Sequence, residues 1–578
     1  MRSIHRRVIL VGAATVATCT LHAQLHMFEG DTTPSWAATI AQYQELADRH
    51  PRTAKLTEIG RDDDGSRIHL FIISDVGTFK PREVREQDRN VLFILNGIHP
   101  GEPDGVNASL MLAQGLLESD QLMGLLATTT VAIVPIYNVS GARQRSASTR
   151  VDQNGPVVCG FRGNARDLDL NRDMVKMDSR NAMALVQALR SWDPDVFIDT
   201  HVSDGADHRY LMELLTTQKD KLDPDVSAFM TRTLVPELYA WMERKKVPMC
   251  PYFELRRQVP DSGLVGFLDG PRYTTGYTAL FNTIGIMAES HMRKPFADRV
   301  NATYQLLLAT LAVLDQHGRE LRDARQRAEA RTRSIQRRPV RWTLDTTVVQ
   351  KEEFLGYRSE MRRSAVSGLP RLFYDGSRPV DLTVDRYDHY VPALVIDRPK
   401  AYLVPQAWRE VMQRLALNGV EMERLNNDTS FVAEMYRIGE MRTTSSPYEG
   451  HYLHSDVEVG VERDTVQAHA GDMLVPMGHA TDRYVMEVLE PQSDDGLFAW
   501  GFFDSILQQK EWFNDYSFEE KAAELLAADP ELAEALERKR EADPGFAADG
   551  WAHLAFVFRR SPYMEPNYRR YPIARLLP

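Results

Sequence analysis

From about Trp36 to Gln316, short apolar runs alternate with longer amphipathic stretches. The apolar runs are rich in β-branched residues and bounded by turn residues, as is typical of strands; they are 67–74, 91–98, 129–138, 195–201 and 284–290. The stretches between them have the apolar spacing of helices; they are 106–117, 180–192 and 226–246. This alternation predicts an α/β domain with a mixed, largely buried sheet flanked by helices.

The sequence pattern changes after Pro339, where most of the segments resemble strands. A long, charge-rich helix is predicted from Phe296 to Ile335, and it would close the first domain. Beyond it, five segments read as strands of an antiparallel sheet: 340–349, 380–387, 429–438, 456–470 and 482–491. Helices are expected at 406–417 and in the tail at 517–540. We therefore predict a catalytic domain over residues 24–335 and a C-terminal β-rich accessory region with a helical tail over 336–578.

Length and composition limit the class of protein. A chain of 578 residues is too long for a single core, and its length suggests two to four domains. With 43% hydrophobic and 26% charged residues, it reads as a globular protein, and the mature chain has no apolar run long enough to span a bilayer. The formal net charge of −12 argues against nucleic acid as a partner, because phosphate binding favours a basic face.

The first 23 residues have the layout of a secretory signal peptide. Arg2, Arg6 and Arg7 precede an apolar stretch that closes on small residues near Ala23. We therefore expect a secreted or periplasmic protein, with a buried N-terminal helix as the alternative. Cys19 allows a second alternative, a lipid anchor, although Thr rather than Gly or Ala precedes it.

Two cysteines remain in the mature chain, Cys159 and Cys250. In an oxidising compartment they could form a disulfide. The sequence does not place their Cα atoms, so pairing and free thiols both stay open.

Three strand-like runs lead to polar residues suited to hydrolytic chemistry. The run 91–98 leads into His99 and Glu102, the run 195–201 ends at His201, and the run 284–290 contains Glu289. In sheets of this class, ligands bind beyond the carboxyl ends of the strands. We therefore expect these side chains to meet at one edge of the sheet.

His99, Glu102 and His201 supply three nitrogen and oxygen ligands, the set that a catalytic zinc ion takes while keeping a position open for water. Read singly, His99 and Glu102 could belong to a surface turn, and His201 could be a structural strand-end histidine. Glu289 lies in an apolar strand, where a carboxylate is costly unless it is paired or functional, so we expect it to be the general base. Arg172 offers a planar fork for a substrate carboxylate.

The joint pattern resembles the M14 family of zinc carboxypeptidases: H-x-x-E at His99, then Asp169-Leu170-Asn171-Arg172, a distant His201 and Glu289. The resemblance covers roughly residues 35 to 315. It implies one Zn²⁺ ion held by His99, Glu102 and His201. It also implies that Asp169 orients a zinc-bound histidine and that Asn171 and Arg172 bind the terminal carboxylate of a peptide.

The resemblance implies two further roles whose residues are less sharply defined. Arg162 resembles the arginine that polarises the scissile carbonyl, but Arg166 lies close by and either could fill that role. A tyrosine on a loop before the catalytic glutamate is expected to cap the substrate. Tyr273 and Tyr277 are the candidates, and neither stands at a spacing that decides between them.

The C-terminal half resembles the accessory region that accompanies a bacterial subgroup of this family, through segments 401–415 and 484–513 and the closing 571–575. The resemblance implies no ligand or activity for this half. We expect it to pack on the catalytic domain or to frame the cleft.

Other histidines favour structural readings. His291 shares a strand face with Glu289 and could tune it, although a structural role is favoured. His451 and His454 form an H-x-x-H without a third ligand in view, which favours strand or turn residues over a second metal site.

The leading functional hypothesis is a zinc carboxypeptidase that removes C-terminal residues from peptides with a free carboxylate. An amidase or deacylase with the same zinc core is the second hypothesis, and a murein-peptide carboxypeptidase is a variant of the first. A non-catalytic binding module is the third. The presence of all three ligands together with Glu289 argues against it.

Overall fold

The computed structural model describes residues 27–577. The predicted signal peptide and Cys19 lie outside the described residues. Within residues 27–577, every helix is too short or too polar to cross a membrane.

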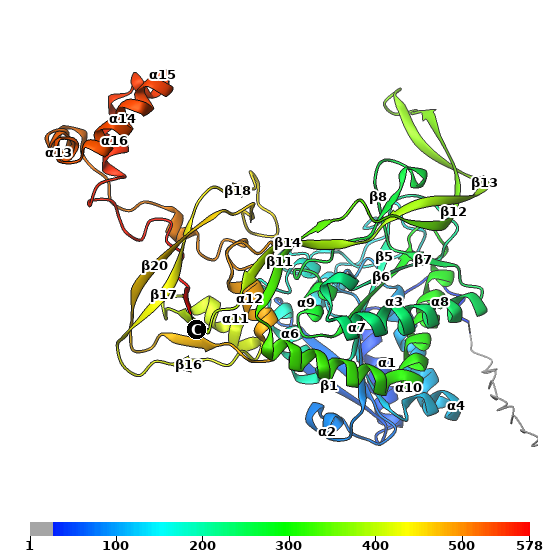
Figure 1. The fold of residues 1–578 in the computed structure, drawn as a ribbon. Coiled ribbons are helices and arrows are strands. Elements are labelled where there is room, and N and C mark those ends of the chain that lie inside the picture. The colour runs from blue at the N-terminus through cyan, green and yellow to red at the C-terminus, as the bar shows by residue number, and fades with distance from the viewer. Residues whose placement is uncertain (1–26, 578) are drawn as a thin grey trace, which may run out of the picture.

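A mixed eight-stranded sheet, with strand order β1-β2-β4-β3-β5-β10-β6-β7, forms the centre of the first half of the chain (Figure 1). Its strands are β1 (Ala54–Arg61), β2 (Arg67–Ile73), β3 (Asn90–Leu95), β4 (Thr129–Val134), β5 (Val196–Ser203), β6 (Met212–Thr216), β7 (Met249–Pro251) and β10 (Ile284–His291). The central strands β4, β3, β5 and β10 run parallel to one another, whereas β6 pairs antiparallel to β10. The neighbouring strands β3, β5 and β10 therefore present their carboxyl ends at one edge of the sheet.

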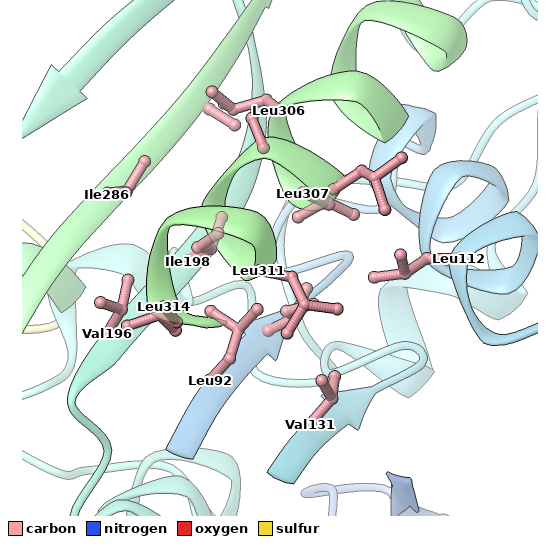
Figure 2. Close-up of a cluster of buried hydrophobic side chains, with 14 of the residues drawn as sticks. Leu92, Leu112, Val131, Val196, Ile198, Ile286, Leu306, Leu307, Leu311 and Leu314 are labelled. Atoms are coloured by element: carbon pink, nitrogen blue, oxygen red, sulfur yellow. The ribbon is translucent and has the colours of Figure 1, made fainter. Parts of the chain in front are cut away.

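One face of this sheet is covered by α3 (Asp104–Glu118) and the long α10 (Phe296–Ser334). Figure 2 shows Leu307, Leu311 and Leu314 of α10 directed at the sheet, where strand residues such as Leu92 and Ile198 meet them. Each of these side chains is fully buried, and burial of one such side chain stabilises the fold by about 2 kcal/mol. The same face carries α1 (Trp36–Arg49), α7 (Pro224–Phe229) and α8 (Val235–Arg244).

The other face packs against α6 (Arg180–Trp192), α9 (Thr274–Ala279) and residues of the C-terminal region. Phe93 and Phe197 of the sheet belong to the same buried cluster as Tyr402, Tyr484 and Trp500. Because this apolar cluster is continuous, the C-terminal region packs directly on the sheet of the first half.

The C-terminal region is built mainly from strands. A six-stranded sheet contains β15 (Ala401–Val404), β16 (Glu423–Arg424), β17 (Thr429–Ile438), β20 (Val459–Ala468), β21 (Met473–Pro476) and β22 (Ala574–Leu576). The strands β11 (Arg337–Leu344) and β14 (Tyr390–Asp397) pair with each other, and β18 (Arg442–Thr443) pairs with β19 (His454–Ser455).

A long hairpin of this region returns to the first half of the chain. It consists of β12 (Gln350–Arg363) and β13 (Pro370–Tyr387), which extend a sheet through β9 (Leu264–Val265) and β8 (Glu254–Leu255). The described chain also contains short helices α2 (Pro81–Glu86), α4 (Asp120–Met123), α5 (Val139–Arg143), α11 (Arg409–Leu417) and α12 (Asp482–Leu489). The tail forms α13 (Asp515–Ala528), α14 (Pro530–Ala542), α15 (Pro544–Ala547) and α16 (Gly550–Phe558), set apart from the rest in Figure 1.

The predicted fold class is confirmed: a mixed, buried α/β sheet is followed by a β-rich region that ends in helices. One expected strand is wrong, because segment 482–491 begins with helix α12. All eight residues of that helix are buried, and its short run of Tyr, Val and Leu also suits a strand, because a short apolar run does not distinguish a buried helix from a strand. Asp482, the first residue of the helix, accepts hydrogen bonds from the backbone N–H groups of Gly478 and His479, which precede the helix.

The proposed domain boundary after residue 335 falls between α10 and β11. Cys159 and Cys250 are both buried free thiols in this structure.

Candidate active site

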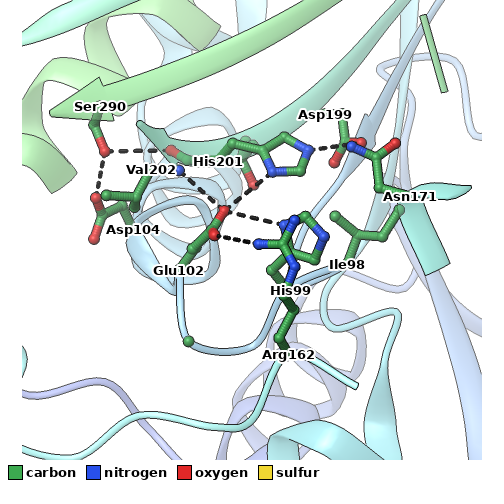
Figure 3. Close-up of polar contacts among 12 residues, drawn as sticks. Ile98, His99, Glu102, Asp104, Arg162, Asn171, Asp199, His201, Val202 and Ser290 are labelled. Carbon is green, nitrogen blue, oxygen red and sulfur yellow. Dashed lines mark hydrogen bonds and ion pairs between the residues drawn. The ribbon is translucent and has the colours of Figure 1, made fainter. Parts of the chain in front are cut away.

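His99, Glu102 and His201 come together at the carboxyl edge of the sheet. His99 and Glu102 lie in the turn between β3 and α3, and His201 lies near the end of β5. Glu102 Oε2 lies 3.3 Å from His99 Nδ1 and 3.1 Å from His201 Nδ1 (Figure 3). Each of the three residues is only 3% exposed. The sequence placed them at one edge, and the structure brings their ligand atoms within 4.8 Å of one another.

The protonation of the two imidazoles explains why this group suits a cation. His99 Nε2 is 2.8 Å from Asp169 Oδ1, and His201 Nε2 is 3.0 Å from Asp199 Oδ2. The neutral tautomer of each imidazole that has its proton on Nε2, on the side of the carboxylate, leaves Nδ1 with a lone pair directed at Glu102. Three electron-pair donors that face one another without a proton repel, and a divalent cation between them removes the repulsion. The residues present therefore fit a zinc ion.

Asp169 is the best-connected carboxylate of the site. Its Oδ1 accepts hydrogen bonds from His99 Nε2 and from the backbone N–H of Asn171 at 2.9 Å, and its Oδ2 accepts one from Arg162 Nε at 3.0 Å. Burial would raise the pKa of Asp169, but His99 and Arg162 outweigh burial and hold this pKa well below its usual range. Asp169 is thus an ionised acceptor that fixes the orientation of His99.

Glu289 faces the same cavity from the next strand. In the parallel pairing of β10 with β5, Glu289 stands opposite His201. It is 8% exposed and lines a cavity of about 340 Å³ together with the three ligand residues. Burial raises the pKa of Glu289 to about 8, with His201 opposing the shift. A carboxyl group with a raised pKa beside a metal site can accept and return a proton near neutral pH.

Asn171 and Arg172 also line this cavity. Asn171 is fixed because its Oδ1 accepts a hydrogen bond from the backbone N–H of Thr274 at 3.3 Å. The guanidinium carbon of Arg172 lies 4.5 Å from the ring centroid of Tyr273, and Arg172 Nη1 donates to the Asn171 carbonyl at 2.9 Å. The arginine fork is therefore held in place with its side chain partly exposed to the cavity.

The two tyrosine candidates separate in the structure. Tyr273 lines the cavity. Tyr277 lies one turn further along α9, is 1% exposed, and donates its hydroxyl hydrogen to Asn418 Oδ1 at 2.6 Å. The expectation that Tyr277 binds substrate is corrected, because its hydroxyl is used in the packing of α9 against the C-terminal region.

The arginine alternatives also separate. Arg162 lines the cavity and lies 3.2 Å from Glu102 Oε1. Arg166 points elsewhere and donates to the carbonyl of Asp178 at 2.6 Å. Sequence reasoning missed Arg150, which also lines the cavity and lies 2.9 Å from Glu102 Oε1. Arg150 stands in an irregular segment without a motif, and only its position between the H-x-x-E and N-R motifs could have suggested it.

A second buried group consists of Glu213 on β6, His291 at the end of β10 and His208 in the loop between β5 and β6. His208 Nδ1 accepts from the backbone N–H of Tyr210 at 3.2 Å, and its Nε2 lies 3.0 Å from Glu213 Oε1. His291 Nε2 lies 2.9 Å from the Ala206 carbonyl, and its Nδ1 accepts from the backbone N–H of Arg293 at 3.4 Å.

Burial lowers the pKa of His208 to about 3 and that of His291 to about 4. Both imidazoles are thus neutral and use both nitrogens in hydrogen bonds, so this group is a structural network rather than a metal site. The nitrogens of His291 are both engaged with backbone groups, which leaves it no hydrogen bond to offer Glu289.

His451 and His454 have separate partners. His451 Nε2 lies 2.6 Å from Asp178 Oδ2, and His454 Nε2 lies 2.8 Å from Asp504 Oδ1. Their nitrogens do not converge on one point.

Comparison with known proteins finds a family that is similar to part of the first half of the chain. Residues 39–201 match the model of the family Peptidase M14, described as zinc carboxypeptidase. This segment is similar to that family. The match contains His99, Glu102 and His201, and together with their geometry it identifies one zinc ion as the cofactor of the site. The resemblance predicted from the sequence is confirmed.

Curated relatives match a short part of the chain. Carboxypeptidase 2 of Trichophyton tonsurans is 26% identical over 108 residues, which are 19% of this chain and 20% of the relative. Carboxypeptidase 2 of Trichophyton rubrum is 26% identical over 110 residues, with the same coverage. The chain thus spans about a fifth of the length of these relatives.

Solved structures overlap about half of the chain. A metallo-carboxypeptidase from Burkholderia cenocepacia is 18% identical with a TM-score of 0.36, and the match covers 49% of this chain and 70% of that one. Carboxypeptidase A from Helicoverpa armigera is 15% identical with a TM-score of 0.38, and the match covers 51% and 75%.

Proposed function

We propose that this protein is a zinc-dependent metallocarboxypeptidase that hydrolyses the C-terminal peptide bond of peptides. One observation carries the proposal: Arg172 and Glu289 line the same cavity as His99, Glu102 and His201. A carboxylate-binding arginine, a buried carboxyl group and a metal group are the parts that removal of a C-terminal residue needs.

Each side chain has a distinct role in this proposal. Arg172 and Asn171 bind the free carboxylate of the substrate, because a guanidinium fork and an amide can donate to both of its oxygens. Tyr273 holds the Arg172 fork by stacking and forms part of the cavity wall. Arg162, with Arg150 beside it, faces the scissile carbonyl and stabilises negative charge on its oxygen.

Glu289 is the proposed general base and acid. Its carboxylate accepts a proton from the attacking water and returns it to the leaving amine, so the two transfers cancel over one turnover. When bound, zinc supplies Lewis-acid chemistry to this site by polarising a carbonyl and acidifying water. Burial at the end of β10 keeps bulk water from screening these charges.

The substrate's terminal carboxylate provides the test. A panel pairs peptides that carry a free C-terminus with the same peptides amidated, and release of the C-terminal residue is followed by mass spectrometry. We expect cleavage of the free peptides and at least about a hundredfold lower kcat/KM for the amides, because a buried charge-assisted contact is lost. Equal cleavage of both sets would exclude the exopeptidase proposal.

N-acyl amino acids form a second arm of the panel. They also carry a free carboxylate that Arg172 could bind, so they distinguish a carboxypeptidase from an amidase or deacylase built on the same zinc core. Preferential cleavage of these compounds over peptides would replace the proposed activity with the second one. Peptides from murein in the same panel test the variant suited to a periplasmic enzyme.

The location and domain division are also proposals. The basic and apolar layout of residues 1–23 supports a signal peptide and hence a secreted or periplasmic enzyme. The mature N-terminus, determined by mass spectrometry of the exported protein, would test cleavage after Ala23. We propose residues 24–335 as the catalytic domain and residues 336–578 as the accessory region.

A further inference from the structure

A tight turn of the C-terminal region, Tyr448–His451, contacts two active-site residues that are far from it in sequence, Asp169 and Arg172. The backbone N–H of Asp169 donates to Glu449 Oε2 at 2.7 Å, over a separation of 280 residues. Arg172 Nε donates to the hydroxyl oxygen of Tyr448 at 3.1 Å, over a separation of 276 residues. Adjacent residues of one turn therefore contact both the carboxylate that orients His99 and the arginine proposed to bind substrate.

The backbone of this turn is unusual for its sequence. Tyr448 and His451 exchange backbone hydrogen bonds of 2.7 and 3.0 Å, and the two central residues, Glu449 and Gly450, have φ of +50° and +83°. Positive φ at both central positions is the pattern of a type I′ turn, which favours Asn-Gly. Glutamate at the first position costs conformational energy without helping the turn. We attribute the presence of glutamate here to its carboxylate, which accepts the hydrogen bond from the Asp169 N–H.

The turn is anchored on both sides of these contacts. His451 Nε2 lies 2.6 Å from Asp178 Oδ2 of the catalytic half. The Tyr448 ring is stacked on the fully buried Trp500, with centroids 6.0 Å apart and planes inclined by 21°. Because these partners fix the turn, Tyr448 and Glu449 can hold their active-site neighbours in position rather than merely follow them.

Two chains of hydrogen bonds connect the turn with residues of the active site. Glu449 holds the backbone of Asp169, whose Oδ1 lies 2.8 Å from His99 Nε2, so the first of them ends at the zinc ligand. Tyr448 holds Arg172, whose Nη1 is already committed to the Asn171 carbonyl, so the second ends at the substrate carboxylate.

We propose that Tyr448 and Glu449 are positioning residues of the active site, through which the C-terminal region sets zinc affinity and substrate binding separately. Glu449 tunes the zinc site through Asp169. Tyr448 orients Arg172 for the substrate carboxylate, and this second part rests on the proposed function.

A pair of substitutions at Glu449 separates positioning from turn stability. Glu449→Asn suits the turn better, but its side chain is one methylene shorter and cannot accept the hydrogen bond from the Asp169 N–H. Glu449→Gln keeps the length of the side chain and an oxygen that can accept this hydrogen bond. We expect Glu449→Asn to keep the Tm of the native protein and to weaken zinc binding about tenfold, as measured by competition with a chelating dye. Glu449→Gln should retain native zinc affinity. The opposite order, with Asn equal to native and Gln weakened, would show a purely structural turn and overturn the Glu449 assignment.

Tyr448→Phe tests the second chain of hydrogen bonds, because it removes the hydroxyl and keeps the ring on Trp500. We expect an increase in KM for a free-carboxylate peptide of about tenfold, with kcat and zinc affinity near native. Tyr452→Phe is the matched control: this tyrosine is on the same loop, 50% exposed, and all kinetic constants should stay native. A native KM in Tyr448→Phe would overturn the Tyr448 assignment.

The two measurements also separate this inference from the proposed function. Zinc affinity is measured without substrate, so it decides the Glu449 assignment whatever the protein cleaves. A native protein that binds zinc but cleaves none of the peptides would overturn the proposed function and the Tyr448 assignment with it.

Discussion

Two buried His-Glu-His groups lie beside neighbouring strands of one sheet, and only one of them suits a metal. In the group of His99, Glu102 and His201, carboxylates hold the Nε2 atoms and the Nδ1 atoms converge on Glu102. In the group of His208, Glu213 and His291, backbone groups and Glu213 engage both nitrogens of each imidazole. The two groups have the same residue types and are both buried. They differ in the ring nitrogen that could bind a metal: it faces a shared carboxylate in the first group and is already used in a hydrogen bond in the second.

The largest expected difference between the groups is in zinc content. His201→Ala removes one of three ligands, and we expect bound zinc to fall from about one equivalent to near zero, with loss of activity. Elemental analysis of the purified, dialysed variant measures this directly. His208→Ala is the matched substitution in the other group and should keep its zinc.

The cost of His208→Ala should appear in stability instead. It removes one of the two side-chain donors to Glu213, leaving only the Ser203 hydroxyl, and opens a cavity beside Tyr210 and Phe354, so the free energy of unfolding should fall by about 3 kcal/mol. Loss of zinc from His208→Ala at native stability would invert the comparison.

Glu289 stands between the two groups, opposite His201 on one side and Glu213 on the other. Glu289→Gln keeps the shape of the side chain but cannot accept a proton. We expect kcat to fall by about 10³-fold at unchanged zinc content. Turnover near the native rate would assign the base to another group and would remove Glu289 from the mechanism.

A smaller and pH-dependent effect is expected at Glu213. Burial raises the pKa of Glu213 from 4.5 to about 7, so the folded state favours the protonated form. The stability that this proton contributes is complete below about pH 4.5 and is lost as pH rises to about 7, a change of about 3 kcal/mol.

Glu213→Gln should therefore lack this loss, because an amide does not titrate. Denaturant unfolding of the native protein and the variant at both ends of this pH interval gives the difference. A difference that stays constant with pH would mean that Glu213 is not held in its neutral form.

The sequence predicted the parts of the fold that have a clear period. The strands around residues 91–98, 195–201 and 284–290 and the helix at Phe296–Ser334 are found where they were expected. The error at α12 arose because its short run of Tyr, Val and Leu is compatible with a strand as well as with a buried helix. The hairpin β12–β13 was largely missed, since its long strands are mostly exposed and polar.

The residues of the candidate site also fall into a group that the sequence predicted and a group that it missed. His99, Glu102, His201 and Glu289 follow or end apolar runs, so strand topology alone brings them to one edge. Arg150, Tyr448 and Glu449 lie in loops whose course depends on tertiary packing, and no local pattern marks them. The choice of Tyr273 over Tyr277 likewise depends on which side of α9 meets the C-terminal region.

The central claim is that one of the two histidine groups holds zinc and the other holds none. A crystal of the zinc-loaded protein, with anomalous diffraction collected on either side of the zinc absorption edge, tests it most directly. We predict one anomalous peak within bonding distance of His99, Glu102 and His201. A peak at His208, Glu213 and His291, or the absence of a peak at the first group, would contradict it.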